Sequence, residues 1–252
     1  MEPPPPPRLI TAVAVFSLAV LVPHTRAADA PSTLGVSANW SGYVATGAHF
    51  SGVAGSWTVP SARCLTSSRR ATAAAFWVGL GGALRGSRKV EQVGTAYGCN
   101  ADGSVTHFAW YELWPKPPVP LSMDVEPGDR MRGSVRLDGR TVTLVLVDAT
   151  SGRRFARTMR VPLPDASSAE WIGEAPAVAT GVGTELVPLT TFSRVTFSRA
   201  TATANGRTAA IGDRAWTATR VKLGSARRPR VVPTALGADG RTFSLRWAGG
   251  AA

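Results

Sequence analysis

The stretch Met131–Val147 reads M-R-G-S-V-R-L-D-G-R-T-V-T-L-V-L-V and indicates the class of fold. Apolar and polar residues alternate on both sides of the pair Asp138-Gly139. Alternation with a period of two is typical of a β-strand that buries one face. An Asp-Gly pair between two such runs is a strong hairpin signal. We therefore expect two antiparallel strands joined by a tight turn.

The same pattern continues along most of the chain, and helical periodicity is nearly absent. One candidate strand, 153–161, follows the turn at Ser151-Gly152, and another, 242–247, follows the turn at Asp239-Gly240. Two further candidates are 193–203 and 214–221. Many short strands at this spacing favour an antiparallel sandwich or barrel. Nothing in the sequence indicates a repeat or a second domain.

The N-terminal segment has the pattern of a secretory signal peptide. A short proline-rich start with the cation Arg8 precedes an almost wholly apolar run, Leu9–Val22. That run is too short to anchor a protein in a bilayer, although an uncleaved anchor is the alternative. Small residues allow cleavage after Ala27 or Ala30. We expect a signal peptide at 1–27, a lead-in at 28–38 and one domain at 39–252, in a secreted, extracellular protein without stable membrane association.

Two cysteines, Cys64 and Cys99, remain in the expected mature chain. In an oxidising compartment the simplest expectation is one disulfide between them, and two free buried thiols are the alternative. Such a bond closes a loop of 34 intervening residues.

The chain is strongly basic, with a net charge of +12. Removing residues 1–27 takes away one acidic and two basic side chains, which leaves +11. The arginines are scattered singly, and the densest cluster, Arg227-Arg228-Pro229-Arg230, lies in an expected loop. A solvated basic surface is therefore favoured over a nucleic-acid site. We expect polypeptide substrates, no nucleic acid, and a monomer.

The inventory of reactive residues argues against several mechanisms. Only three histidines exist, His24 lies in the signal region, and His49 and His107 lack partners at metal-ligand spacing. No G-x-S-x-G elbow accompanies them, and the G-L-G-G run at 79–82 lacks the lysine of a phosphate-binding loop. We expect no metal and no cofactor.

Carboxylates and carboxamides among aromatic residues remain as candidates. They occur in the four segments F-W-V-G-L-G-G (76–82), V-E-Q-V-G-T (90–95), A-W-Y-E-L-W-P (109–115) and S-S-A-E-W-I-G-E-A-P (167–176). One interpretation is a core with its tryptophans inside and its acids in solvent. The other is a peptide or sugar groove lined by some of the eight tryptophans.

Taken in order, these segments resemble the glutamic peptidases, or eqolisins, of the bacterial secreted type. The match also includes N-W-S-G-Y-V (39–44), G-S-W-T-V-P (55–60), E-P-G-D (126–129) and F-S-R-V-T-F (192–197). Together the motifs span about 160 residues in the family's order. Each motif alone is weak, but the ordered set is specific.

The resemblance implies an all-β fold of two antiparallel sheets packed face to face, the lectin-like (concanavalin A-like) jelly roll, with a groove on the concave side. It also implies a catalytic pair, in which the glutamine of the Q-x-G motif falls on Gln92 and the glutamate of the A-E-W motif on Glu170. Such an endopeptidase uses the glutamate as general base and then acid, and the glutamine to stabilise the oxyanion. We expect this activity at acidic pH.

Other residues are expected around the pair. Trp40, Trp77, Trp110 and Glu112 are candidates for substrate binding, and Glu112 is also a candidate to orient Gln92 or a water. A plain surface role for Glu112 is the alternative. Glu91 should point away from the site because side chains alternate along a strand. Glu174 is expected to be structural or to lie on the rim.

This chain also departs from the family. The fungal members carry aspartates where it has Gly81, Ala96 and Phe108, and they are poor in Lys and Arg. Fewer nearby carboxylates mean less mutual elevation of their pKa values, which argues against a very acidic optimum.

Two other functions compete with the peptidase. A glycoside hydrolase would need two carboxyl groups about 5–5.5 Å apart for a retaining mechanism. Glu170 and Glu174 on one strand lie roughly 13 Å apart by strand rise, so Glu112 would have to approach Glu170. The second competitor is a non-catalytic sandwich that binds carbohydrate or peptide.

Overall fold

The computed structural model describes residues 35–64, 71–87, 89–180 and 183–248. The expected signal peptide and its cleavage sites lie outside these residues. Within the described part of the chain every regular element is a β-strand, which confirms the all-β prediction. No helix there is long and apolar enough to cross a membrane.

The strands run as follows. The first ten are β1 (Val36–Ser37), β2 (Trp40–Thr46), β3 (Phe50–Thr58), β4 (Ala62–Arg63), β5 (Thr72–Leu80), β6 (Glu91–Cys99), β7 (Val105–Leu113), β8 (Val119–Pro120), β9 (Arg130–Asp138) and β10 (Thr141–Asp148). The others are β11 (Arg154–Arg160), β12 (Ser168–Glu174), β13 (Ala177–Thr180), β14 (Gly183–Leu186), β15 (Thr191–Phe192), β16 (Val195–Ala204), β17 (Arg207–Ala210), β18 (Thr217–Gly224), β19 (Pro229–Pro233) and β20 (Phe243–Trp247).

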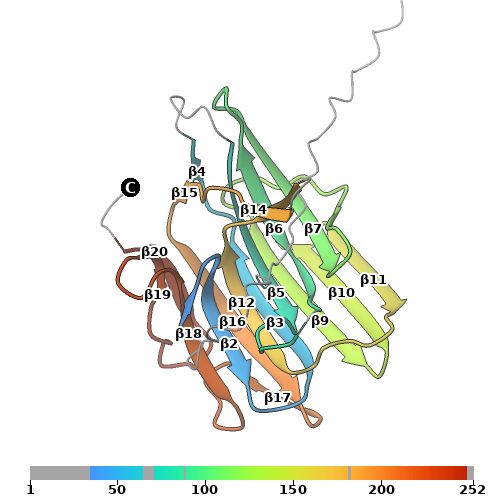
Figure 1. The fold of residues 1–252 in the computed structure, drawn as a ribbon. Coiled ribbons are helices and arrows are strands. Elements are labelled where there is room, and N and C mark those ends of the chain that lie inside the picture. The colour runs from blue at the N-terminus through green and yellow to red at the C-terminus, as the bar shows by residue number, and fades with distance from the viewer. Residues whose placement is uncertain (1–34, 65–70, 88, 181–182, 249–252) are drawn as a thin grey trace, which may run out of the picture.

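Sixteen of these strands form one hydrogen-bonded sheet that folds over into two layers (Figure 1). The strand order is β11-β10-β9-β3-β16-β20-β19-β18-β2-β12-β5-β6-β7-β8. The front layer holds β2, β12, β5, β6 and β7, and the back layer holds β9, β10, β3 and β16. Pairing is antiparallel throughout this path, as expected for a sandwich. The short β1 pairs in parallel with β18.

The hairpin expected at 131–147 is present as β9 and β10. Val142 lies opposite Leu137, and Leu146 opposite Gly133. Val142, Leu144 and Leu146 are buried between the layers, while the residues between them are partly exposed. The alternation seen in the sequence therefore corresponds to one core face and one outer face.

The main core fills the space between the two layers. Its largest side chains come from both sheets and include Trp171, Phe76, Tyr97, Phe197 and Phe243. A second, smaller cluster lies on the opposite face of the front layer and contains Trp40, Trp77, Trp110, Ile172 and Val44. The front layer is thus covered on both faces, and its central strands β5, β6 and β12 are buried almost throughout.

One expected strand begins later than predicted. The range 214–221 was expected to be extended, but β18 starts at Thr217. Asp213 accepts hydrogen bonds from the backbone N–H of Ala215 and from the guanidinium of Arg207, which holds residues before Thr217 in a turn. The local hydrogen bonds of an aspartate compete here with strand pairing.

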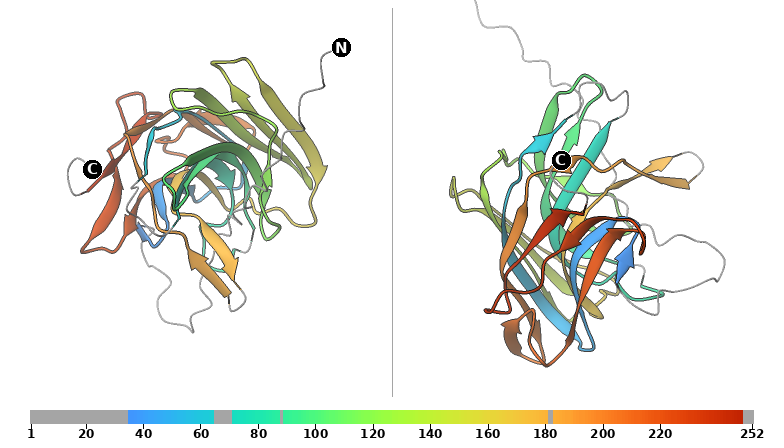
Figure 2. Two further views of the ribbon diagram at one scale, coloured as in Figure 1. Left: turned by 90° about the horizontal axis from the view of Figure 1, so that it is seen from above. Right: turned by 90° about the vertical axis from the view of Figure 1, so that its left-hand side faces the viewer.

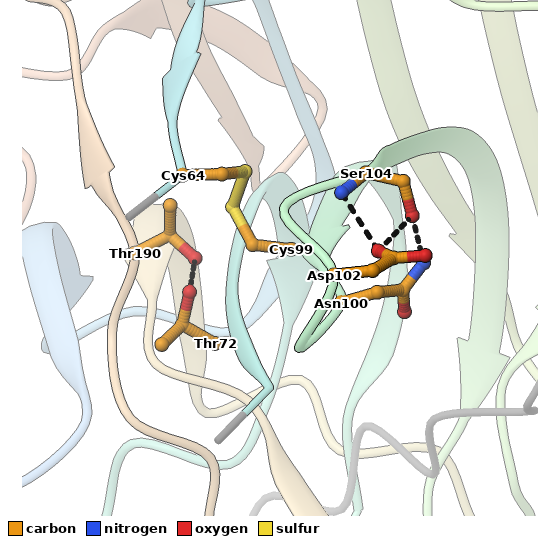
Figure 3. Close-up of a disulfide and its surroundings, with 7 residues drawn as sticks. All are labelled: Cys64, Thr72, Cys99, Asn100, Asp102, Ser104 and Thr190. Carbon is orange, nitrogen blue, oxygen red and sulfur yellow. Dashed lines mark hydrogen bonds between the residues drawn. A yellow bond between two sulfur atoms is a disulfide. The ribbon is translucent and has the colours of Figure 1, made fainter. Parts of the chain in front are cut away.

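Cys64 and Cys99 form the expected disulfide, with 5.5 Å between their Cα atoms (Figure 3). The bond joins Cys64, the residue that follows β4, to Cys99, the last residue of β6. Nearby, the hydroxyl of Thr190 donates to that of Thr72, and Asp102 accepts two hydrogen bonds from Ser104. The bond therefore ties the start of the β6–β7 turn to the chain that leaves β4.

Replacing both cysteines with serine should lower the free energy of unfolding by about 3–4 kcal/mol, because the disulfide restricts a loop of this length in the unfolded chain. Urea unfolding of the double variant beside the wild type, each with and without reductant, measures the effect. With reductant, the free energy of unfolding of the wild type should approach that of the double variant. The stability of the variant itself should not change with reductant. Equal stability of all four samples would show that the bond contributes nothing.

Candidate active site

Four neighbouring strands place the two expected catalytic residues in one row across the front layer. Glu170 of β12 lies opposite Gly79 of β5, and Gly79 lies opposite Gln92 of β6. Gln92 in turn lies opposite Glu112 of β7. Since adjacent strands are about 4.8 Å apart, the Cα atoms of Glu170 and Gln92 are separated by roughly 10 Å, with only a glycine between them.

The glycine at 79 keeps the space between these two side chains open. A Cβ atom at this position would lie 3.0 Å from Gln92 Cβ and 3.0 Å from Cζ3 of Trp77. Any larger residue would therefore push into Gln92 or occupy the gap in front of Glu170. The G-L-G-G run, which lacks a phosphate-binding function, here provides room in the site.

Glu170 is fully buried, and neither of its carboxyl oxygens has a hydrogen-bond partner among the described residues. Burial raises the pKa of Glu170 well above the usual glutamate value. The hydroxyl of Ser168 lies close enough to oppose this shift in part, but it is outside hydrogen-bond geometry. The charges of Asp165 and Glu91 raise the pKa further. A buried carboxyl group without a partner is costly, so this position is a strong candidate for chemistry.

Gln92 is also fully buried, and its Nε2 donates a hydrogen bond to Oε2 of Glu112. The carboxamide has two N–H donors, so one remains, and Oε1 has no partner within the described chain. Burial raises the pKa of Glu112 to about 9, the charge of Glu174 adds to this, and the hydrogen bond from Gln92 opposes it. The expected contact between Glu112 and Gln92 is therefore present.

Glu174 has a different environment, although it lies on the same face of β12. Its two oxygens accept hydrogen bonds from Asn39 Nδ2 at 3.0 Å and from Trp77 Nε1 at 2.7 Å. Burial raises its pKa to about 7, and these donors oppose the shift. Because both oxygens are paired within the protein, Glu174 acts as a buried structural acceptor.

The three tryptophans expected at the substrate site lie on this face, in the smaller cluster. Trp77 and Trp110 lie opposite Gly94, in the row next to that of Gln92 on the same face. Both are fully buried and Trp40 is nearly so, so none of the three forms an open wall. Trp40 packs edge-on against Trp77 at 5.1 Å between ring centroids. Trp110 Nε1 has no hydrogen-bond partner among the described residues.

Asp165, which the sequence analysis did not single out, organises the loop beside the site. It accepts hydrogen bonds from the hydroxyl of Ser87, the backbone N–H of Gly82 and the backbone N–H of Ser167 at 2.8 Å. Burial alone would raise its pKa, but these hydrogen bonds outweigh burial and lower it. The only signal in the sequence is an aspartate followed by small residues, which is common in turns.

Glu91 is buried and lies opposite Leu80 and Leu113, on the other face of β6 from Gln92. It therefore points away from the row, as expected. Burial raises its pKa to about 8, and the charge of Asp165 adds to this. Among the described residues, no three His, Cys, Asp or Glu side chains gather in a way that would hold a metal ion.

The fold and this row define a β-sandwich protein with buried carboxyl groups and a carboxamide gathered on one face of its front sheet. Residues 38–235 match the Peptidase A4 family. The chain belongs to this family, and it is therefore a peptidase, a hydrolase that acts on peptide bonds of polypeptide substrates. The resemblance to glutamic peptidases found in the sequence is confirmed.

Individual relatives agree with this assignment. Aspergillopepsin-2 of Aspergillus niger is 28% identical over 198 residues, which cover 70% of this chain and 68% of the relative. The crystal structure of scytalido-glutamic peptidase with a transition-state analogue inhibitor matches with a TM-score of 0.71 at 24% identity, over 83% of this chain and 98% of the other. SCP-B, an eqolisin in complex with a tripeptide, matches with a TM-score of 0.67 at 23% identity over the same shares. The structural matches concern the fold.

The buried glutamates predict how stability depends on pH. The folded-state pKa values of Glu174, Glu91 and Glu112 are raised to about 7, 8 and 9, so the native protein holds these protons more tightly than the unfolded chain. Their stabilising contribution is complete below the unfolded value near 4.5 and is lost as pH rises toward 9. The urea concentration at the midpoint of unfolding should therefore decrease as the pH rises from about 5 to about 9.

The variant Glu112→Gln, Glu174→Gln tests the origin of this fall, because two of the four buried glutamates with raised pKa values no longer titrate. Its urea midpoint should depend less on pH than that of the wild type. Glu185→Gln, which changes an exposed carboxyl group, is the control and should keep the wild-type dependence. An unchanged slope in the double variant would contradict the assignment to these buried groups.

Proposed function

We propose that this protein is a secreted endopeptidase that cleaves peptide bonds with a Gln92–Glu170 pair and works at acidic pH. One observation carries the proposal: Glu170 is a buried carboxyl group without a hydrogen-bond partner in the described chain, and it lies across Gly79 from Gln92. The family assignment supports the reaction class. The signal-peptide pattern of residues 1–27 supports secretion.

Glu170 serves as general base and then as general acid. As carboxylate it takes a proton from a water that attacks the carbonyl carbon of the scissile peptide bond. The resulting carboxylic acid then gives this proton to the leaving nitrogen as the C–N bond breaks. The raised pKa of Glu170 brings the basicity of the carboxylate closer to that of these partners.

Gln92 stabilises the charge that develops on the carbonyl oxygen. One N–H of its amide is held by Glu112, and the second remains available to donate to the oxyanion. Oε1 of Gln92 is free to accept a hydrogen bond from the attacking water. A neutral carboxamide also avoids the repulsion between two facing carboxylates, which would otherwise share one proton.

Glu112 acts through Gln92 as a positioning residue. Its hydrogen bond fixes which end of the carboxamide faces Glu112, and so directs the other groups of Gln92 into the row. The raised pKa of Glu112 keeps this carboxyl neutral in acid, where it still accepts through its carbonyl oxygen. The contact therefore survives in the proposed range of pH.

The same burial supports an acidic working range. Glu91, Glu112 and Glu174 are protonated in the native state at acidic pH, so the fold avoids buried charges there. The base needs Glu170 to be ionised, however, and its raised pKa moves the acid limb of kcat/KM upward. Gly81, Ala96 and Phe108 supply no further carboxylates. We therefore propose an optimum in mild rather than extreme acid.

The alternative glycoside hydrolase receives little support from the row. Two strands separate Glu112 from Glu170, which places their Cα atoms about 14 Å apart. Glu112 is also engaged by Gln92, a residue that a pair of glycosidase carboxylates does not require. A non-catalytic binding protein would leave Glu170 buried and unpaired without a use for it.

Substitution of either member of the pair should remove activity. Hydrolysis of an unfolded protein, measured from about pH 2 to pH 8 to span carboxyl pKa values, should fall at least 10²-fold in Gln92→Ala through loss of an oxyanion donor. Glu170→Gln should fall further, because it removes the proton acceptor. Near-UV circular dichroism checks folding, and Glu185→Gln is the control. Full activity in a folded Glu170→Gln variant would exclude this mechanism.

Glu112 is tested by comparing two substitutions. Glu112→Ala should lower kcat about 10²-fold, because a misplaced catalytic group costs this much, with a smaller change in KM. Glu112→Gln should recover much of the loss, since its amide oxygen still accepts a hydrogen bond from Gln92. A merely structural role predicts equal loss of stability and of active protein in both variants, without a selective effect on kcat.

A further inference from the structure

The back layer carries a groove on its outer face, on the opposite side of the sandwich from the row of Glu170 and Gln92. Its floor is β3, whose outward residues Gly52, Ala54 and Ser56 are small. Val53, Gly55 and Trp57 alternate with them and face the core. Because the floor side chains are short, the longer side chains of the two flanking strands stand above it as walls.

Arginines form one wall of this groove. On β9, Arg136 lies opposite Gly52, Arg132 opposite Ser56, and Arg130 opposite Thr58. All three arginines are exposed, whereas Met131, Gly133 and Val135 between them are buried. The strand period therefore lines up on one face the charges that appear scattered in the sequence, about 7 Å apart where they occupy alternate residues.

The second wall is formed by β16 and is rich in hydroxyl groups. Thr196, Ser198 and Thr203 line it, and Thr203 bonds to Thr208 of β17. The pairing of β16 with β3 shifts register between Ser198 and Thr201. Arg199 lies at this bulge with φ of 53°, a left-handed conformation that is uncommon for a residue with a side chain. The bulge adds the exposed Arg199 to the lining of the groove.

The groove contains two hollows along β3, with volumes of about 310 and 630 Å³. Arg130, Arg132 and Arg199 line the first, and Arg136 lines the second. Among the described residues that line the two hollows, the only carboxylate is that of Asp138, at the end of β9. Among the described residues the ion pairs are Arg153–Asp124 and Arg207–Asp213, so none of the four groove arginines is neutralised by one.

These features select an extended anionic ligand. The planar guanidinium fork binds carboxylate, sulfate or phosphate groups through two parallel hydrogen bonds. The serine and threonine hydroxyls opposite can both donate to and accept from sugar hydroxyls. Trp57, the one aromatic residue in the lining, is buried, so the described groove offers no exposed ring on which nucleobases would stack.

We propose that this groove binds an anionic polysaccharide, a sugar chain that carries repeated sulfate or carboxylate groups. The site is distinct from the proposed catalytic row and does not depend on it. Since the two faces point in opposite directions, a charged matrix bound to the back layer does not cover the face of the front layer that carries the proposed catalytic row. Part of the excess of arginine in the chain is then explained by the binding of this ligand in the groove.

The test compares two triple variants with equal loss of charge. Arg130→Thr, Arg132→Thr, Arg136→Thr removes the wall and keeps a residue favourable in strands. Arg214→Thr, Arg227→Thr, Arg228→Thr removes three exposed arginines elsewhere. Binding is measured by fluorescence anisotropy with labelled dextran sulfate, polygalacturonate, neutral dextran, a poly(dT) oligonucleotide and polyglutamate, at 50 and 200 mM salt. Peptidase activity on an unfolded protein checks that each variant folds.

We expect the wild type to bind dextran sulfate or polygalacturonate, and the better ligand of the two identifies sulfate or carboxylate as the preferred group. The groove variant should bind at least tenfold more weakly, since it loses three charge-assisted contacts, while the control changes by less than about twofold. Binding should weaken with salt as released counterions oppose it.

Three results would overturn the proposal. Equal weakening in both triple variants would indicate diffuse attraction to a basic surface rather than a site. Tighter binding of poly(dT) or polyglutamate than of either acidic polysaccharide would assign the groove to another class of polymer. Absence of polysaccharide binding at 50 mM salt would show that the groove has no such ligand. Loss of peptidase activity in all proteins, wild type included, would count against the proposed function alone.

Discussion

The position of Trp171 in the core is the constraint on which the arrangement of the front sheet depends. Its indole N–H donates to the carbonyl oxygen of Ala54 in the back layer at 2.8 Å, and its ring packs against Gly55, where an added Cβ would lie 2.8 Å from the indole. Because side chains alternate along β12, a buried Trp171 forces Glu170 onto the opposite face. A slip of one residue would exchange the two and destroy the core and the row together.

The front sheet also buries several glutamates, and these differ in the hydrogen bonds that their carboxyl groups accept. Glu174 is paired by Asn39 and Trp77, and Glu112 accepts from Gln92, whereas Glu170 has no partner in the described chain. Hydrogen bonds thus offset part of the desolvation cost at both oxygens of Glu174 and at one oxygen of Glu112, and none of it at Glu170. Protonation in acid relieves part of this cost, so one physical cause links the environment of the site to the pH at which the fold is most stable.

The two layers divide their outer faces between opposite kinds of chemistry. The face of the front layer gathers buried acids, a carboxamide and tryptophans, and the face of the back layer presents arginines beside hydroxyl groups. Figure 2 shows the strands of both layers from two further directions. The main core fills the space between the layers, so the basic groove and the acid row need not perturb each other. A net charge of +12 is therefore compatible with a site made of carboxyl groups.

The sequence by itself determined the all-β class, the hairpin at 131–147 and the disulfide, because alternation, an Asp-Gly turn and a single pair of cysteines are local or unique features. The ordered motifs also identified the family and named Gln92 and Glu170. Only the tertiary structure decided that Gly79 lies between those two residues and that Asp165 holds the adjacent loop. It also decided that Trp77 donates a hydrogen bond to Glu174, and that arginines scattered in the sequence form one wall of a groove. These arrangements depend on pairing between strands far apart in the chain, and local residue patterns do not encode which distant strands become neighbours.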